Sequence, residues 1–327
     1  GDLKKYDDRN RILEVLNENI CQAWMQGYIQ TGRNCLMISY EAFMPIITSM
    51  IEQYAKWLYQ ANNISWRYKV ASATYVLTSL CWENTYSHQN PSIIDTLLAC
   101  QYSFVKVYTP PDANSLLVIL EKCLTSENEI NLIITSKQQM PQWLDITTAQ
   151  QAIHNQIIYW DFYKSASKFP DVCIVAAGDY PARECVKAVE IMERFALKIN
   201  IRLIFVLELT ALGSQEIYPT AIGNDMFSNI FGNGSIIFSF HGYTAIIKAL
   251  LFGRTSHQKI TILGYENKSI YSDNSIGKLI INGNSRFDIA IKAFQYLFED
   301  SRINSETYEK ICLSIEGLQK NDKSSQF

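Results

Sequence analysis

The sequence of 327 residues lacks any apolar run long enough to cross a bilayer, because polar residues interrupt every hydrophobic stretch. It has no stripe of Lys and Arg, and its formal net charge is only -3, so neither a membrane nor a nucleic acid is expected as a partner. It also lacks a CxxC pair, although eight cysteines are scattered along it, mostly in apolar segments. This pattern predicts reduced, buried thiols and a cytoplasmic protein.

Several common catalytic signatures are absent as well. The sequence has no glycine-rich phosphate loop, no nucleophile elbow, no zinc-protease helix and no Cys/His set at metal-ligand spacing. No residue is therefore predicted to bind a metal. The chain has only four histidines, so a histidine in a polar loop is a candidate acid, base or phosphate ligand.

What is present is a regular alternation of short strand-like runs and longer helix-like runs. Repeated βα units with apolar strands predict an α/β fold of two domains with mostly parallel sheets. A polar, mixed stretch over 151–167 is the predicted linker between a domain over 1–150 and a domain over 168–327. The predicted strands are 11–16, 35–39, 69–78, 104–110, 130–136, 171–179, 199–209, 235–240 and 259–265, and the predicted helices are 17–30, 40–62, 92–100, 112–126, 182–198, 245–252 and 285–300.

Glu18 stands in the first turn of the helix predicted to follow Asn17, which is suited to cap it. An acid in this place stabilises the helix dipole by about 0.3–1 kcal/mol, and that plain reading competes with a role in an active site. Tyr40 and Phe43 in the run SYEAF are either core aromatics or parts of a site. Spacing alone leaves these alternatives open.

Three other stretches place polar residues beside predicted strands. The run TYSHQNP holds His88 and Gln89 in a loop, where His88 is either structural or a functional acid, base or phosphate ligand. Lys137 follows a strand directly, at the edge where α/β sheets bind ligands, and is either solvated or suited to an anionic substrate. His241 and Gly242 also follow a strand and form either a tight turn or part of a site.

A series of motifs, taken in order, resembles phosphoketolase, a thiamine-diphosphate enzyme related to transketolase. SYEAF, PPDAN, KQ with QWLD, and HGY are together the most specific. The resemblance implies a transketolase-like pyrimidine-binding domain over 1–150, incomplete at its N-terminus, and a transketolase-like C-terminal domain over 168–327. The motifs are VLNENICQAWMQGYIQTGR, SYEAFMPIITSMIEQYAKWL, ISWR, YSHQNP, VYTPPDANSLL, NLIITSKQ, PQWLD, AAGDYPARE and FHGY.

The resemblance also implies cofactors and residue roles. Thiamine diphosphate with Mg²⁺ is expected, and Glu18 is implied to hydrogen-bond its aminopyrimidine ring and favour the imino tautomer. Phe43 is implied to pack on that ring, and Tyr40 and His88 to line the reacting centre. The residues implied to contact substrate or phosphate are Lys137, Asn84 and Gln89.

The implied reaction cleaves xylulose 5-phosphate or fructose 6-phosphate with inorganic phosphate, and it yields acetyl phosphate and an aldose phosphate. The family's diphosphate-binding domain carries a motif beginning Gly-Asp-Gly that holds the metal, and no such motif occurs here. We therefore expect this chain alone to be inactive and to form a homodimer, with a separate N-terminal phosphoketolase half as a further expected partner.

Several polar positions depart from the family pattern. Asn19 and Asn34 stand where the family has histidines, and HGYPW has become HGYTA. The loop before SHQ is a few residues shorter, so that Asn84 is the candidate for its asparagine and the loop glutamine has no counterpart. The alternative hypothesis is accordingly a catalytically inactive descendant that serves as a binding or regulatory partner.

Overall fold

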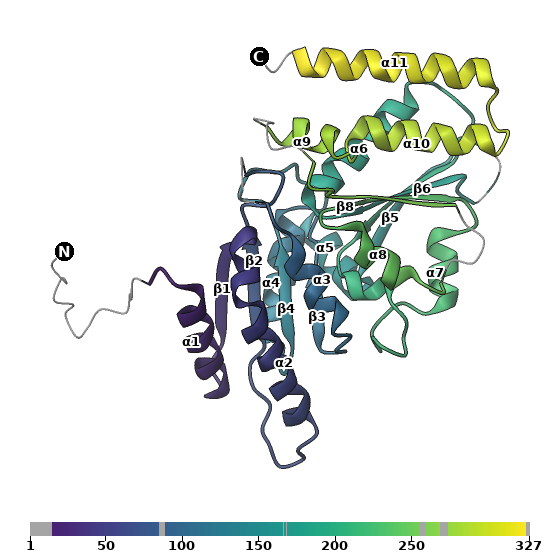
Figure 1. Cartoon of the computed structure of the whole chain (residues 1–327). Coiled ribbons are helices and arrows are strands. Elements are labelled where there is room, and N and C mark those ends of the chain that lie inside the picture. Colours follow the sequence, from purple (N-terminus) through teal and green to yellow (C-terminus); the bar gives the residue numbers. More distant parts are fainter. Residues whose placement is uncertain are drawn as a thin grey trace.

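The computed structural model describes residues 15–84, 89–165, 167, 169–254, 259–268 and 274–324, and Figure 1 shows them as two α/β domains side by side. The first domain is built on a parallel four-stranded sheet in the order β1-β2-β4-β3. Most of its strand residues are apolar and buried, as parallel strands with helices on both faces require. The strands are β1 (Cys35–Tyr40), β2 (Ala73–Thr78), β3 (Val105–Tyr108) and β4 (Ile130–Ile134).

Helices cover both faces of this sheet. The predicted single helix over 40–62 is wrong, because Pro45 lacks a donor N–H and the segment begins as a 3-10 helix before α2 starts. The strand predicted over 11–16 lies mostly outside the described residues. The helical elements are α1 (Glu18–Gln30), η1 (Glu41–Ile47), α2 (Thr48–Asn62), α3 (Ser92–Ala99), α4 (Ala113–Thr125) and α5 (Ile146–Asn155).

The second domain has a five-stranded sheet in the order β5-β7-β6-β8-β9, in which only β5 runs antiparallel. The predicted α/β class with mostly parallel sheets is thus confirmed. The stretch expected to be a linker, 151–167, holds the end of α5 and the edge strand β5. The strands are β5 (Ile157–Phe162), β6 (Val172–Ala177), β7 (Ile201–Val206), β8 (Ser235–Phe240) and β9 (Ile260–Leu263).

Helices α6 and α10 pack on one face of the second sheet, and α11 covers α10 (Figure 1). The apolar cores continue from one domain into the other. One core joins α1, α2 and α3 to the α7 and α8 side of the second domain, and the other joins α4 and α5 to α6 and α10. The helical elements here are α6 (Asp179–Glu193), η2 (Leu209–Leu212), α7 (Asn224–Phe231), α8 (Thr244–Leu251), α9 (Ser275–Ile281), α10 (Arg286–Glu299) and α11 (Ser305–Ser324).

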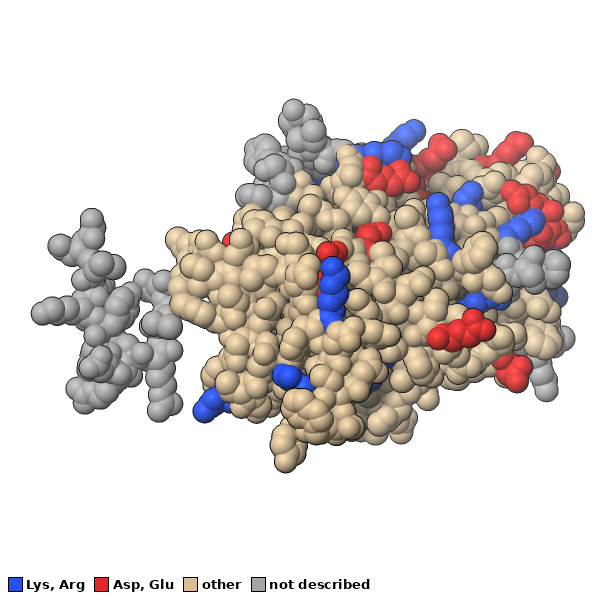
Figure 2. Space-filling model, turned by 60° about the horizontal axis from the view of Figure 1, so that its bottom comes forward, with Lys and Arg blue, Asp and Glu red and all other residues tan. Residues whose placement is uncertain are grey.

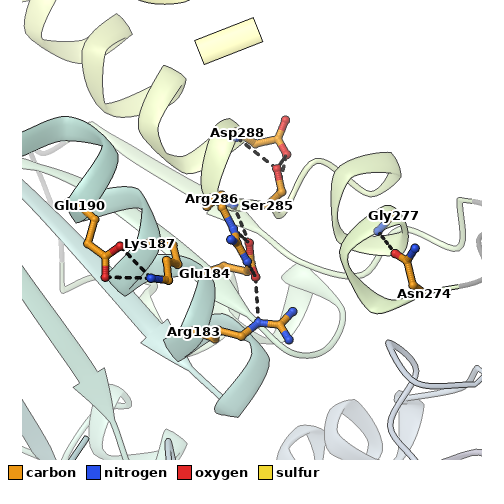
Figure 3. A network of polar contacts seen from close by, with 9 residues as sticks. All are labelled: Arg183, Glu184, Lys187, Glu190, Asn274, Gly277, Ser285, Arg286 and Asp288. Carbon is orange, nitrogen blue, oxygen red and sulfur yellow. Dashed lines mark hydrogen bonds and ion pairs between the residues drawn. The ribbon is translucent and has the colours of Figure 1, made fainter. Parts of the chain in front are cut away.

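A buried ion pair ties α6 to the start of α10 (Figure 3). The Glu184 side chain is fully buried, and its carboxylate accepts hydrogen bonds from the Arg286 Nε and Nη2 at 2.8 Å each. The Arg286 backbone N–H and the Arg183 Nε also donate to it, both at 3.0 Å. Burial raises the pKa of Glu184, but the hydrogen bonds and charges of the arginines outweigh burial and leave this pKa below its ordinary value.

Candidate active site at the edge of the first sheet

Glu18 is the first residue of α1, a helix that packs against β1 and against η1, the element that follows β1. The Asn17 side chain accepts a hydrogen bond from the Ile20 N–H at 2.9 Å, so the predicted cap is confirmed. The short turn through Gly32, whose φ is +79°, reverses the chain into β1. The Glu18 side chain is half-buried, and no hydrogen bond or ion pair joins its carboxylate to another described residue.

Three predicted site residues meet at this edge. Tyr40 ends β1, and its ring stacks on the Phe43 ring with centroids 5.8 Å apart and planes at 8°. Tyr40 is 46% exposed, so it is not a core residue. Lys137, which follows β4, holds its Nζ 5.1 Å from the centre of the Tyr40 ring. A flat, accessible ring surface with a cation beside it results.

The loop after β2 lies at the same edge. Asn84 is buried. Its backbone carbonyl accepts hydrogen bonds from the Gln89 Nε2 at 2.7 Å and from the Lys278 Nζ of the second domain. The Asn84 amide in turn donates to the Ser79 carbonyl. Asn84 therefore orders this loop, and Gln89 contacts it directly. His88 lies outside the described residues.

Behind the aromatic pair, a buried carboxylate joins the two domains. Glu41 lies between Tyr40 and Phe43 in the sequence but is only 1% exposed. One oxygen lies 2.5 Å from the His241 Nε2, and the other accepts a hydrogen bond from the Cys81 N–H at 2.8 Å. The sequence indicates His241 only as a turn or a site residue, and the sequence analysis assigns no role to Glu41. A carboxylate embedded in an aromatic run was the available signal.

A second set of polar contacts crosses the same domain boundary. The Asp179 carboxylate accepts the N–H of Ser136 at 2.5 Å and that of Tyr180 at 2.7 Å, and Tyr180 donates its hydroxyl to Glu83 at 3.3 Å. Burial raises the pKa of Asp179 to about 6, although its hydrogen bonds oppose the shift. The carboxyl ends of strands from both sheets thus face each other across a polar, acidic boundary.

The residues at the edge fit one half of a site for a flat heteroaromatic cofactor. Tyr40 and Phe43 offer ring surfaces, Glu18 offers a carboxylate without a partner among the described residues, and Lys137 offers a cation for a phosphate group. A thiamine ring system has these three needs: stacking, a hydrogen bond acceptor at a ring nitrogen, and charge for an anionic group.

None of the helices in the described part of the chain is long and apolar enough to span a membrane.

Several solved transketolases have a fold similar to that of this chain. Campylobacter jejuni transketolase superposes with a TM-score of 0.61 at 11% identity, over 85% of this chain and 38% of that one. A split-gene transketolase described as an inactive beta4 tetramer superposes with a TM-score of 0.60 at 14% identity, over 86% of this chain and 82% of that one. At these identities the likeness shows the fold, which is transketolase-like.

The sequence comparison is more specific. The family model for D-xylulose 5-phosphate/D-fructose 6-phosphate phosphoketolase matches residues 2–126, and the model for the C-terminal domain of that family matches residues 137–323. The chain belongs to the phosphoketolase family.

Two probable phosphoketolases illustrate how much of the family this chain spans. That of Nitrosospira multiformis is 37% identical over 286 residues, which are 86% of this chain and 35% of that protein. That of Chlorobaculum tepidum is also 37% identical, over 85% of this chain and 36% of that protein. The chain spans little more than a third of the length of these relatives.

Proposed function

We propose that this chain supplies the pyrimidine-binding half of a phosphoketolase site. The reaction would cleave xylulose 5-phosphate or fructose 6-phosphate with phosphate to give acetyl phosphate and an aldose phosphate. The observation that carries the proposal is the joint placement of Tyr40, Phe43 and Lys137 at one sheet edge. Family membership supports the reaction class. All eight cysteines are free, which agrees with the cytoplasm as the proposed compartment.

In this proposal, thiamine diphosphate with Mg²⁺ supplies the carbon nucleophile when it is bound. Glu18 would accept a hydrogen bond from the pyrimidine ring and govern its protonation, and Phe43 would pack against the ring. Tyr40 would line the reacting centre, and the family resemblance assigns the same role to His88, which lies outside the described residues. Lys137, Asn84 and Gln89 form the proposed contacts to substrate or phosphate. The domain limits proposed for these roles are 1–150 and 168–327, with 151–167 between them.

The test combines this chain with the N-terminal part of a relative such as the Nitrosospira multiformis protein, which extends well beyond the matched region. Calorimetric titration with thiamine diphosphate and Mg²⁺ is expected to show binding to the mixture and weak or no binding to this chain alone. Acetyl phosphate formation from xylulose 5-phosphate then reports activity. Tight cofactor binding to the isolated chain would contradict the proposed half-site.

One feature favours a protein partner and supports assembly of the chain with itself. Exposed apolar side chains recur along one side of α1 at four-residue spacing, Ile20 at 42%, Trp24 at 51% and Tyr28 at 50%, and Leu16 just before the helix is also fully exposed. The left side of the molecule, which carries α1 and α2, has few charged side chains (Figure 2). We propose a homodimer that covers this stripe, and the split-gene transketolase is itself described as a tetramer.

Trp24→Glu is expected to weaken self-association by about 30-fold or more, because a central tryptophan typically contributes at least ~2 kcal/mol to an interface. Sedimentation equilibrium measures the change. The matched control is Phe252→Glu, since Phe252 is 89% exposed but lies at the end of α8 in the second domain. A monomeric wild-type chain would refute the dimer, and equal effects of both variants would refute an interface that covers this stripe.

The second candidate function is that of a catalytically inactive partner of phosphoketolase. The observation that favours it is the engagement of the loop after β2: the Asn84 carbonyl is already occupied by Gln89 and by Lys278. If the mixture assembles but neither binds thiamine diphosphate nor forms acetyl phosphate, this reading replaces the first.

A further inference from the structure

Glu41 and Tyr40 are neighbours in the chain, yet their side chains point to opposite environments. Tyr40 is 46% exposed at the sheet edge, whereas Glu41 is 1% exposed and lies against the second domain. We propose that Glu41 and His241 form an inter-domain clamp that positions the Tyr40–Phe43 ring pair. This inference rests on the proposed function only where it says that the ring pair holds a cofactor. That Glu41 and His241 join the domains and position the rings does not depend on the proposed function.

The position of Glu41 explains why the clamp would act on the rings. Tyr40 is the residue that precedes η1, and Phe43 lies in the first turn of η1, so both are within two residues of the buried carboxylate. The same carboxylate accepts the Cys81 N–H at 2.8 Å, at the start of the loop that carries Asn84. One side chain therefore holds the ends of β1 and β2 at the edge where the candidate residues gather.

His241 is a rigid anchor. Its backbone N–H donates to the Ala177 carbonyl at 3.1 Å, which fixes the end of β8 to that of β6. Its Cβ packs against Gly178, where an added Cβ would lie 3.1 Å away and where φ is +120°. The edge of the Trp82 ring system meets the imidazole at a centroid distance of 6.3 Å. Movement of the second domain would therefore be passed to Glu41.

The charges around the clamp favour a proton between its two side chains. Burial lowers the pKa of His241, but the Glu41 charge and hydrogen bond outweigh it and leave this pKa above its ordinary value of 6.5. The Glu41–His241 pair therefore stabilises the fold fully at a pH below 6.5, the ordinary pKa of histidine. This contribution is lost as the pH rises through the pKa of His241 in the folded state. Several titratable groups lie around the clamp: Glu41 of η1, Cys81 and Glu83 after β2, Asp179 of α6, Lys278 of α9 beside Cys81, and the hydroxyls of Tyr243 and Tyr265.

A metal ion is the competing occupant, because Glu41, Cys81 and His241 place one ligand atom each within 4.8 Å of one another. Two observations argue against it. The Cys81 Sγ already donates a hydrogen bond to the His241 carbonyl at 3.7 Å. The Glu41 and His241 atoms are already hydrogen-bonded to each other.

The first experiment uses the isolated chain and needs no cofactor. Imidazole NMR of the four histidines, with the His241 signal assigned through His241→Gln, is expected to show His241 titrating above its ordinary value of 6.5. Glu41→Gln should lower that titration point. A wild-type His241 that titrates at or below 6.5 would overturn the clamp, and this result does not depend on whether Glu41→Gln folds.

The second experiment measures positioning directly. Hydrogen exchange of peptides covering 39–44 and 81–84 is expected to rise by roughly tenfold in Glu41→Gln, and the double variant with His241→Gln should add little. Asp300→Asn, which removes a surface partner of Lys259, is the control and should leave both peptides unchanged. Unchanged exchange in a folded Glu41→Gln chain would refute the positioning role.

The link to the cofactor is tested separately in the mixture with the N-terminal part of a relative. Glu41→Gln is expected to weaken thiamine diphosphate binding by roughly tenfold, and Glu41→Asp, which keeps the charge, to restore part of it. If wild type does not bind the cofactor either, the proposed function fails while the exchange and NMR results still decide the clamp. Normal cofactor affinity in Glu41→Gln would show that the clamp does not serve the ring pair.

Discussion

Replacing Glu18 by Gln is expected to lower acetyl phosphate formation by the complemented enzyme by about 10²–10⁴-fold, the usual range for loss of a residue that governs proton transfer. Gln keeps the size and a hydrogen bond acceptor but not the charge that sets the protonation of the bound ring. Cofactor affinity should change much less than turnover. Coupled detection of acetyl phosphate, together with calorimetry of thiamine diphosphate, separates the two effects.

The control for this experiment is Glu52→Gln. Glu52 is also a half-buried acid on a helix of the first domain, but it faces Cys100 rather than the sheet edge. Its replacement should leave turnover unchanged. If the Glu18→Gln enzyme formed acetyl phosphate at the wild-type rate, Glu18 would have no catalytic role. It would then be an ordinary acid in the first turn of the helix, where its charge stabilises the helix by interacting with the helix dipole.

Arg286→Met is expected to destabilise the second domain by about 3–5 kcal/mol, because it leaves the Glu184 carboxylate buried without its main partner. Only the Arg183 Nε and backbone contacts remain near that charge. Urea unfolding followed by circular dichroism measures the loss. Because the pKa of Glu184 is lowered in the folded state, the ion pair also makes stability depend on pH. Its contribution is fully present above pH 4.5, the ordinary pKa of the group, and is lost as the pH falls through the pKa of the folded state.

Lys187 and Glu190 provide a matched control on the same helix, one turn away (Figure 3). Their ion pair at 2.8 Å is about half exposed, so Glu190→Gln should cost less than about 1 kcal/mol. The double variant Glu184→Met with Arg286→Met should recover much of the loss, because no charge is then left buried. A cost for Arg286→Met no larger than that for Glu190→Gln would show that the pair does not hold α6 to α10.

Much of the local structure follows from the order of residues. Asn17 caps α1 and Asp112 caps α4 through contacts to backbone N–H groups three residues further on, and such short-range chemistry is written in the sequence. The apolar runs predicted the buried parallel strands for the same reason. The error over 40–62 was also local: Pro45 was there to be weighed against a strong apolar periodicity.

The long-range pairings could not be predicted in this way. Glu41 and His241 are 200 residues apart, and Arg286 is 102 residues from Glu184. The residues around Glu41 and Glu184 in the sequence do not indicate whether these carboxylates are exposed or are buried with a partner. Burial of a charge depends on which elements pack together in the fold. The motifs SYEAF and FHGY each stand out in the sequence, but nothing in either one indicates that their Glu41 and His241 side chains meet.

The sequence by itself determined the α/β class, the helix caps and the set of residues that belong to the family's motifs. Only the tertiary structure decided which of them meet: Tyr40 with Phe43 and Lys137 on the open edge, and Glu41 with His241 behind it. The physical reason is that parallel strands end at a common edge whatever their order in the chain. The sheet order β1-β2-β4-β3 and the packing of the second domain on that edge therefore bring together groups that the sequence keeps far apart.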